Sequence, residues 1–117
     1  MSNTSQSTRR VVKQHLNAFI LDLGIETLLS DYNERAVLIS PDGVYRGKQE
    51  IGHFLDNLKT RLPDKARDSF KLHIHETSDD VSYIVWSVKD RVPLGTDTFV
   101  VRNNKIVHQT FAMYAQT

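Results

Sequence analysis

The spacing of apolar residues changes at Pro63, and this change restricts the chain to few fold classes. Through most of the chain before Pro63, apolar residues recur every three or four positions, as on one face of an α-helix. After Pro63 they alternate with polar residues, as in strands that bury one face. Helices followed by antiparallel strands are typical of the α+β class. We therefore predict one curved sheet wrapped around the N-terminal helices.

Three helices are predicted before Pro63. The first carries an apolar stripe over residues 12–23, and Gly24 is expected to stop it. The second is shorter and covers residues 25–32. The third has its apolar stripe over residues 51–62, and Pro63 prevents it from continuing because proline lacks a backbone N–H donor.

The predicted strands are short and separated by turn residues. A compact apolar run at residues 36–40 is followed by Pro41-Asp42-Gly43, in which proline presets φ and glycine accepts a positive φ. The later strands are predicted at residues 44–46, 70–75, 81–88, 96–102 and 105–115.

The length of the chain suits a single domain, which we place at residues 9–117. Residues 1–8 are polar and have nothing to bury, so we expect a disordered tail there. The N-terminal segment has no apolar signal core, and no apolar run reaches the roughly 18 residues that a membrane span needs. We therefore expect a cytoplasmic protein without membrane contact.

Charge and motifs exclude several functions. Lys and Arg number 15 and Asp and Glu 14, a balance that gives no attraction to nucleic acid. The absence of cysteine excludes disulfides and thiolate catalysis. No G-x-G-x-x-G, P-loop or G-x-S-x-G motif occurs, so nucleotide binding and a hydrolase elbow have no support, and no cofactor is expected.

Residues 32–55 carry a resemblance to a known family. Their order of helix end, strand, turn, short strand and helix resembles the opening of the SnoaL-like and ketosteroid-isomerase-like domains of the nuclear-transport-factor-like superfamily. The resemblance covers roughly residues 10–115. It implies a cone-shaped α+β fold with a mixed or antiparallel sheet, a small apolar ligand in the cone and a homodimer through the convex sheet face. Some members are isomerases, cyclases, dehydratases or epoxide hydrolases, and many have no catalytic role.

Three positions allow a direct comparison with ketosteroid isomerases. Asp97-Thr98-Phe99 stands where those enzymes have an Asp-x-Phe, whose Asp stays protonated and donates to the substrate oxyanion. Ser40 stands where their general-base Asp lies, and Leu16 lies near the position of their oxyanion-hole Tyr. Serine is a poor base without an activating partner, and leucine donates no hydrogen bond. The chain therefore resembles that scaffold but is not predicted to be a ketosteroid isomerase.

Asp97 is the predicted catalytic residue. It shares a strand face with Phe99 and Val101, and apolar surroundings raise the pKa of a carboxyl because they disfavour its charged form. A raised pKa suits a general acid or hydrogen-bond donor near neutral pH. The alternative is an Asp at a strand end, exposed beside a loop at Gly95.

The register of the last hairpin decides what faces Asp97. A two-residue turn at Asn103-Asn104 would place Asp97 opposite Thr110, whereas a three-residue loop would place it opposite Gln109. The apolar faces match only in the second register, which we favour because a one-residue slip turns a strand's buried face outward. Asp97, Gln109, Phe111 and Met113 are then predicted to line one wall of the pocket.

Histidines offer fewer sites than their number suggests. His73 and His75 are expected on the polar face of one strand, and we interpret them as solvated or dimer-facing, because a zinc site needs at least a third ligand that the sequence does not supply. No metal is therefore predicted, although proton transfer by this pair stays an alternative. His15 is the best single candidate, since one turn of the first helix points into the pocket; the alternative is a partly buried helix histidine.

Aromatic residues are expected to shape the pocket. Trp86 is in phase with the apolar residues of its strand, while Tyr32 and Tyr45 flank the first hairpin and suit a pocket rim. Ordinary core packing is the alternative for each of them. The predicted ligand-binding residues are His15, Tyr32, Ser40, Tyr45, Trp86, Phe99, Gln109, Phe111 and Met113.

Two functions remain open from the sequence. The first is a cofactor-independent isomerase, cyclase or dehydratase that acts by acid–base chemistry on a small apolar carbonyl compound. The second is a non-catalytic module of the same fold that binds a small ligand or dimerises, which the missing base favours.

Overall fold

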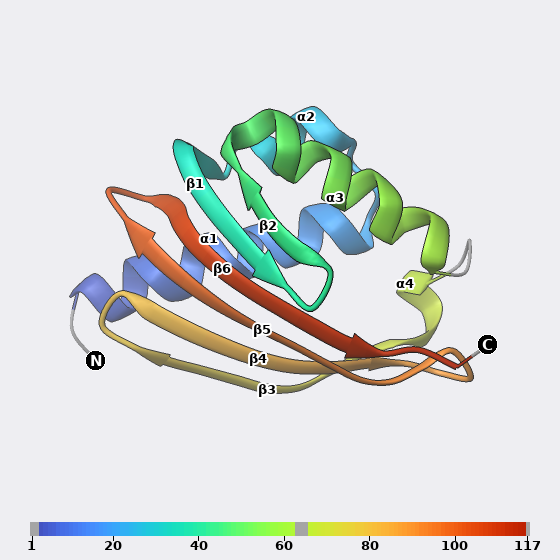
Figure 1. The fold of residues 1–117 in the computed structure, drawn as a ribbon. Coiled ribbons are helices and arrows are strands. Elements are labelled where there is room, and N and C mark those ends of the chain that lie inside the picture. The colour runs from blue at the N-terminus through green and yellow to red at the C-terminus, as the bar shows by residue number, and fades with distance from the viewer. Residues whose placement is uncertain (1–2, 63–65, 117) are drawn as a thin grey trace.

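The computed structural model describes residues 3–62 and 66–116 (Figure 1). Its helices are α1 (Asn3–Ile20), α2 (Ile25–Leu29), α3 (Gly47–Arg61) and α4 (Ala66–Ser69). Its strands are β1 (Tyr32–Ser40), β2 (Gly43–Arg46), β3 (Phe70–Ser78), β4 (Val81–Val88), β5 (Val92–Arg102) and β6 (Lys105–Tyr114). Pro63, the predicted stop of the third helix, and residues 1–2 of the predicted tail lie outside the described residues.

The six strands form one mixed sheet in the order β2-β1-β6-β5-β4-β3. Neighbouring strands are antiparallel, except that β1 and β6 run parallel. The sheet curves without closing, and the longer helices lie across its concave side (Figure 1). There α1 packs on β3, β4 and β5, while α3 packs on β1 and β2. This arrangement confirms the predicted α+β class with a curved sheet around the N-terminal helices.

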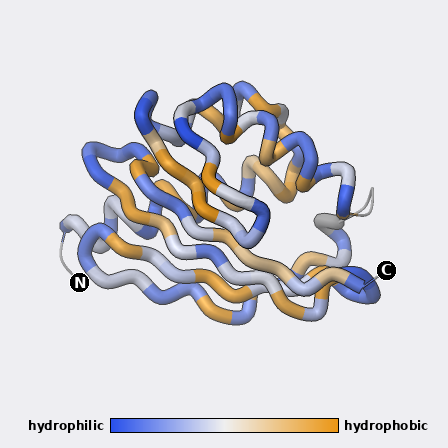
Figure 2. Tube along the Cα trace, viewed as in Figure 1, coloured by the Kyte–Doolittle hydropathy of each residue, from blue (hydrophilic) through white to orange (hydrophobic). Residues whose placement is uncertain are grey.

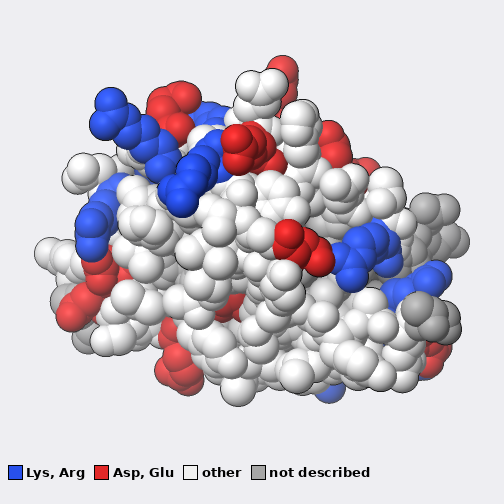
Figure 3. All heavy atoms as spheres, in the orientation of Figure 1, with Lys and Arg blue, Asp and Glu red and all other residues white. Residues whose placement is uncertain are grey.

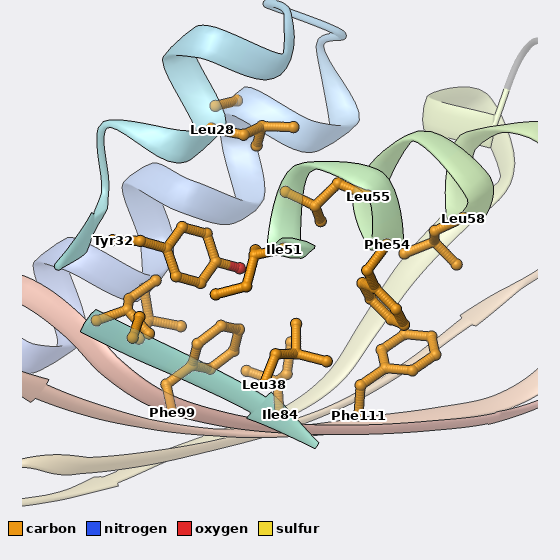
Figure 4. Close-up of a cluster of buried hydrophobic side chains, with 14 of the residues drawn as sticks. Leu28, Tyr32, Leu38, Ile51, Phe54, Leu55, Leu58, Ile84, Phe99 and Phe111 are labelled. Carbon is orange, nitrogen blue, oxygen red and sulfur yellow. The ribbon is translucent and has the colours of Figure 1, made fainter. Parts of the chain in front are cut away.

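The core lies between the helices and the concave face of the sheet. Buried positions alternate along β4, as expected for a strand with one covered face. A stripe of α3 that includes Ile51, Leu55 and Leu58 is buried against this face. Figure 4 shows Phe54 of α3 facing Phe111 of β6, with ring centroids 5.1 Å apart. Hydrophilic residues gather at the turns and the outer sides of the helices (Figure 2).

The start of α1 differs from the sequence-based expectation. The helix begins at Asn3, within the stretch expected to be a disordered tail. Ser5 and Thr8 are buried there, and the Ser5 hydroxyl accepts a hydrogen bond from the backbone N–H of Asp79 at 2.9 Å. The segment is thus joined to the turn between β3 and β4 by a polar contact that composition does not reveal. None of the helices in the described ranges is long and apolar enough to cross a membrane.

The end of α1 also differs, because the helix stops at Ile20 and not at Gly24. Asp22 adopts a left-handed φ of 54°, and its carboxylate pairs with Lys59 of α3 at 2.5 Å. Leu23, counted in the apolar stripe, is therefore exposed. Gly24 instead precedes α2 with a φ of 102°.

Tyr32 begins β1 and does not end the second helix, so that part of the prediction was wrong. Its backbone is opposite Ile106 of β6, and the N–H of Ile106 donates to the carbonyl of Asp31 at 2.8 Å. The strand starts here because a segment more than 70 residues away supplies the pairing. The side chain of Tyr32 is buried and points into the interior (Figure 4).

Both registers considered for the last hairpin were wrong. Asn103 and Asn104 form a two-residue turn with φ values of 52° and 63°, but a bulge follows at once and places an extra residue, Val107, in β6. Asp97 therefore lies opposite Phe111. The favoured register was off by two residues, a shift that leaves every side chain on its predicted face.

A second bulge changes the face of the histidines in β3. Leu72 lies opposite Trp86, but the register shifts before Ile74, and His75 then lies opposite the buried Ile84. His75 thus faces inward, while His73 is exposed. The prediction that both histidines share one polar face was wrong, because the extra residue reverses the alternation.

Candidate functional site

A cavity of about 50 Å³ lies between α1, α3 and the concave face of the sheet. It has room for a few water molecules, and a bulkier ligand would have to displace side chains. Its lining is apolar except for His15, Asp97 and Gln109. The lining residues are His15, Leu16, Phe19, Phe54, Leu55, Leu58, Leu62, Phe70, Trp86, Asp97, Phe99, Gln109 and Phe111.

Asp97 is the acidic group of this cavity. Its inward position on β5 leaves the residue 6% exposed. Oδ1 accepts a hydrogen bond from Nε1 of Trp86, and Oδ2 accepts one from Nε2 of Gln109, both at 2.8 Å. Burial raises the pKa of Asp97 from 3.8 to about 6, and these two hydrogen bonds and the charge of His15 oppose the rise. The carboxyl therefore changes charge close to neutral pH.

Gly95 brings Trp86 within reach of Asp97. Trp86 on β4 lies directly opposite Gly95 on β5. A Cβ on Gly95 would lie 2.2 Å from Cε2 of the indole. Only glycine at position 95 leaves room for the ring to lie across β5. The ring can then reach Asp97, which is two residues after Gly95 on β5. Gly95 lies within β5 and not in a loop, which excludes the alternative of an exposed strand-end Asp.

A buried polar network continues from Asp97 to the other side of α1. The hydroxyl of Tyr32 donates to Oε1 of Gln109 at 2.5 Å and lies 3.1 Å from Nε2 of His15. Nδ1 of His15 lies 2.8 Å from Oδ2 of Asp31. These five residues are all buried and come from α1, β1, β5, β6 and the residue before β1. We call Asp97, Gln109, Tyr32, His15 and Asp31 the buried polar network.

The network satisfies its own polar atoms. Within the described residues, no buried side-chain nitrogen or oxygen lacks a hydrogen-bond partner. Burial, followed by the charges of Asp97 and Asp31, raises the pKa of Tyr32 well above its ordinary value. Tyr32 therefore remains a neutral hydroxyl that can both donate and accept.

Six of the ten predicted site residues line the cavity, and four do not. The six are His15, Trp86, Asp97, Phe99, Gln109 and Phe111. Tyr32 lies behind the lining residue Gln109, to which its hydroxyl donates a hydrogen bond. Tyr45 packs on the ring of Phe54, with ring centroids 5.1 Å apart. The Ser40 hydroxyl accepts the N–H of Asp42 in the first hairpin. Met113 lies on the concave face opposite Gly95, beyond the lining residues.

Asp31 is the site residue that sequence reasoning missed. It lies between α2 and β1, 16 residues after His15, and only the packing of α1 on the start of β1 brings the two side chains together. No spacing rule predicts this pair. In the described part of the chain, no three His, Asp or Glu side chains are placed to hold a metal ion.

Sequence comparison finds no match for this chain, whether to family models or to curated proteins. Structural comparison does. An NTF2-like protein of unknown function from Burkholderia xenovorans LB400 is similar over 99% of this chain and 89% of its own, with 16% identity and a TM-score of 0.76. The chain has the NTF2-like fold. This is the fold that the resemblance in the sequence implied.

Two further structural neighbours carry names that suggest an activity. A candidate ketosteroid isomerase from Kribbella flavida DSM 17836 covers 97% of this chain and 82% of its own, with 10% identity and a TM-score of 0.73. A candidate polyketide cyclase from Sinorhizobium meliloti is similar over 87% of this chain and 93% of its own, with 15% identity and a TM-score of 0.72. Such low identities establish the fold alone, and fold does not determine the reaction.

Proposed function

We propose that this NTF2-like protein binds a small, mostly apolar carbonyl compound in its cavity and that Asp97 moves a proton on that compound without a cofactor. The supporting observation is the carboxyl of Asp97, which lies in an otherwise apolar cavity and has a pKa raised to about 6 by burial. A proton carrier is most effective when its pKa lies near the working pH.

Asp97 is better suited to accept a proton than to donate one at pH 7. A pKa of about 6 leaves the carboxyl mostly ionised at that pH, and both of its hydrogen-bond partners donate to it. Below pH 6 the neutral donor expected from the sequence would predominate. In an isomerisation, the carboxylate would take a proton from the carbon beside the carbonyl and return it to another carbon. Substrate and protein would then finish with the proton count they had at the start.

The cavity supports a small substrate. Phe99, Phe111 and Trp86 supply apolar walls around Asp97, and the cavity holds about 50 Å³. A substrate larger than a few heavy atoms would have to displace lining side chains. Gln109 is the polar lining residue beside Asp97.

Exchange of carbon-bound protons tests this role. Small ketones and cyclic enones would be incubated with the protein in D₂O, and loss of the proton beside the carbonyl followed by NMR. We expect exchange that Asp97→Asn reduces at least 100-fold, because the amide cannot take the proton. Asp56→Asn, a change of the same kind at an exposed position of α3, serves as the control. Equal exchange by the protein and its Asp97→Asn variant would rule out the catalytic role.

A non-catalytic role as a ligand-binding or dimerisation module is the second candidate. Among the residues lining the cavity, only His15 joins Asp97 as an ionisable group, and its ring nitrogens face Tyr32 and Asp31. The outer face of the sheet also carries exposed apolar side chains, including Ile39 on β1. Few charged side chains stand over the middle strands in the view of Figure 3. Such a face suits a homodimer.

Binding and mass measurements separate the two candidates. A dimer by light scattering, with ketone binding but no Asp97-dependent exchange, would favour the non-catalytic module. Ile39→Lys places a charge on the outer face and should give a monomer if two copies meet there. A dimer that persists in Ile39→Lys would argue against this face as the interface.

A further inference from the structure

The buried polar network connects the cavity to the opposite side of α1. At its inner end Asp97 lines the cavity, and at its outer end Asp31 lines an open hollow together with Arg10, Lys13 and Gln14 of α1. Nε2 of Gln14 donates to Oδ1 of Asp31 at 3.4 Å. Two buried carboxyl groups, one at the cavity and one at the hollow, are thus linked through three buried side chains.

The donor and the acceptor of each hydrogen bond in this network can be assigned in turn, starting from Asp97. Gln109 donates its N–H to Asp97, so its carbonyl oxygen accepts from the hydroxyl of Tyr32. That hydroxyl has used its hydrogen, and it can only accept from Nε2–H of His15. Nδ1 of His15 faces the carboxyl of Asp31. In this arrangement Asp97 is ionised, and the His15–Asp31 pair holds both the Nε2 proton and the proton between Nδ1 and Oδ2.

The same side chains support a second arrangement in which the donors and acceptors between Asp97 and Nε2 of His15 are reversed. A protonated Asp97 donates to the oxygen of a Gln109 amide that has turned over, and the amide N–H then donates to Tyr32. The Tyr32 hydroxyl donates to an unprotonated Nε2 of His15, while Nδ1–H still donates to Asp31. Turning an amide over exchanges its nitrogen and oxygen with little change of shape. Both arrangements hold the same number of protons and satisfy each contact.

Other proton counts leave a contact unsatisfied. With one proton fewer, Nδ1 of His15 can face the Asp31 carboxylate without a hydrogen, or Nε2 can face an oxygen of Tyr32 whose hydrogen is already donated. If Tyr32 instead donates to Nε2, the oxygen of Gln109 faces another oxygen without a hydrogen. With one proton more, Asp97 and Nε2 of His15 both carry a proton. Either the hydrogen on Asp97 then faces the Gln109 N–H, or the amide turns over and the Tyr32 hydrogen has no acceptor in the network. A buried polar contact without its hydrogen bond costs stability. The network is therefore most stable when Asp97 and Nε2 of His15 hold one proton between them.

We propose that Asp97 and the His15–Asp31 pair share one proton, and that the orientations of Tyr32 and Gln109 decide which of them holds it. When the proton passes to Asp97, the N–H bond at Nε2 of His15 breaks and an O–H bond forms at Asp97, with solvent water as the carrier. Tyr32 and Gln109 keep their own hydrogens and act as positioning residues. The consequence for turnover rests on the proposed function, because the pair would reset Asp97 after each proton transfer.

The protonation of Nε2 in His15 tests this proposal without any substrate. Asp97→Asn places an N–H donor where the protonated carboxyl would donate, and it should select the reversed arrangement. We expect the ¹⁵N NMR shift of Nε2 to show a protonated nitrogen in the unchanged protein at pH 7 and an unprotonated one in Asp97→Asn. Asp56→Asn should leave the shift unchanged.

Asp97→Ala distinguishes the effect of the hydrogen bond from the effect of the lost negative charge. It also provides a second variant for the test if Asp97→Asn folds poorly. It removes the same negative charge but supplies no donor, so Nε2 should keep its proton more fully than in Asp97→Asn. Equal shifts in both variants would overturn the proposal, because charge alone would then explain them. An Nε2 that stays protonated in Asp97→Asn would overturn it as well. Failure of the ketone exchange assay would leave these NMR outcomes untouched.

Discussion

Replacing Gly95 with alanine tests how the sheet holds Asp97. A Cβ there would lie 2.2 Å from Cε2 and 2.3 Å from Cζ2 of Trp86, so the indole would have to move. The indole stacks on Phe70 with centroids 5.6 Å apart and lies beside Phe111, and both rings restrict that movement. Forcing an extra group into such a site costs about 1–3 kcal/mol. Leaving the carboxyl without the indole N–H costs a further ~1–3 kcal/mol.

We therefore expect Gly95→Ala to lower the free energy of unfolding by about 1–3 kcal/mol if the indole tilts but keeps its hydrogen bond to Asp97, and by about 2–6 kcal/mol if that bond is lost. Urea unfolding measures the loss. The chain has 1 tryptophan, so its intrinsic fluorescence reports the displaced ring directly. The pKa of Asp97 should also rise above about 6, because the indole N–H stabilises the carboxylate.

Gly52→Ala is the matched control for this substitution. Its Cβ would meet the flexible end of Leu29 at 3.3 Å, and alanine is favoured over glycine inside a helix, so stability should change by no more than about 1 kcal/mol. Unchanged stability and unchanged fluorescence in Gly95→Ala would refute the reasoning, since they would mean that the indole does not lie across β5.

Two further predictions concern the buried polar network. Burial raises the pKa of Asp97 from 3.8 to about 6, so between these pH values the folded state binds a proton that the unfolded state has released. The free energy of unfolding, measured relative to Asp97→Asn, should therefore fall by about 2–3 kcal/mol as pH rises from 4 to 7, and a rise instead would contradict the burial of this carboxyl. Tyr32→Phe leaves Gln109 and His15 each short of one partner and should cost ~1–3 kcal/mol in urea unfolding. Tyr114→Phe, at a residue 66% exposed, should cost less than about 0.5 kcal/mol, and equal losses in both variants would argue against the network.

Local pattern was a good guide to the strands and to their faces. The alternation in β4 and β5 correctly indicated which side chains face inward, since side-chain direction alternates with each residue of a strand. Phe99 and Phe111 accordingly reach the cavity with Asp97. Even the wrong register of the last hairpin left these faces unchanged, because it was off by two residues.

The positions of the bulges and the long-range contacts could not be predicted from the sequence. The extra residues at Val107 and near His73 carry no local signal, because the fit of neighbouring strands decides where a ladder takes in an additional residue. The same holds for Tyr32, which begins a strand only because β6 lies beside it. Polar residues at the start of α1 were expected to be disordered, yet the turn between β3 and β4 supplies a hydrogen-bond partner for Ser5.

The amino-acid sequence by itself determined the α+β class, the curved sheet around the helices and an acidic residue on the inner face of β5. These depend on periodicity, which neighbouring residues define. Only the tertiary structure decided that Asp97 is joined to His15 and Asp31 through Gln109 and Tyr32. Those contacts join positions 12 to 77 residues apart, and their geometry arises when α1, β1, β5 and β6 pack together.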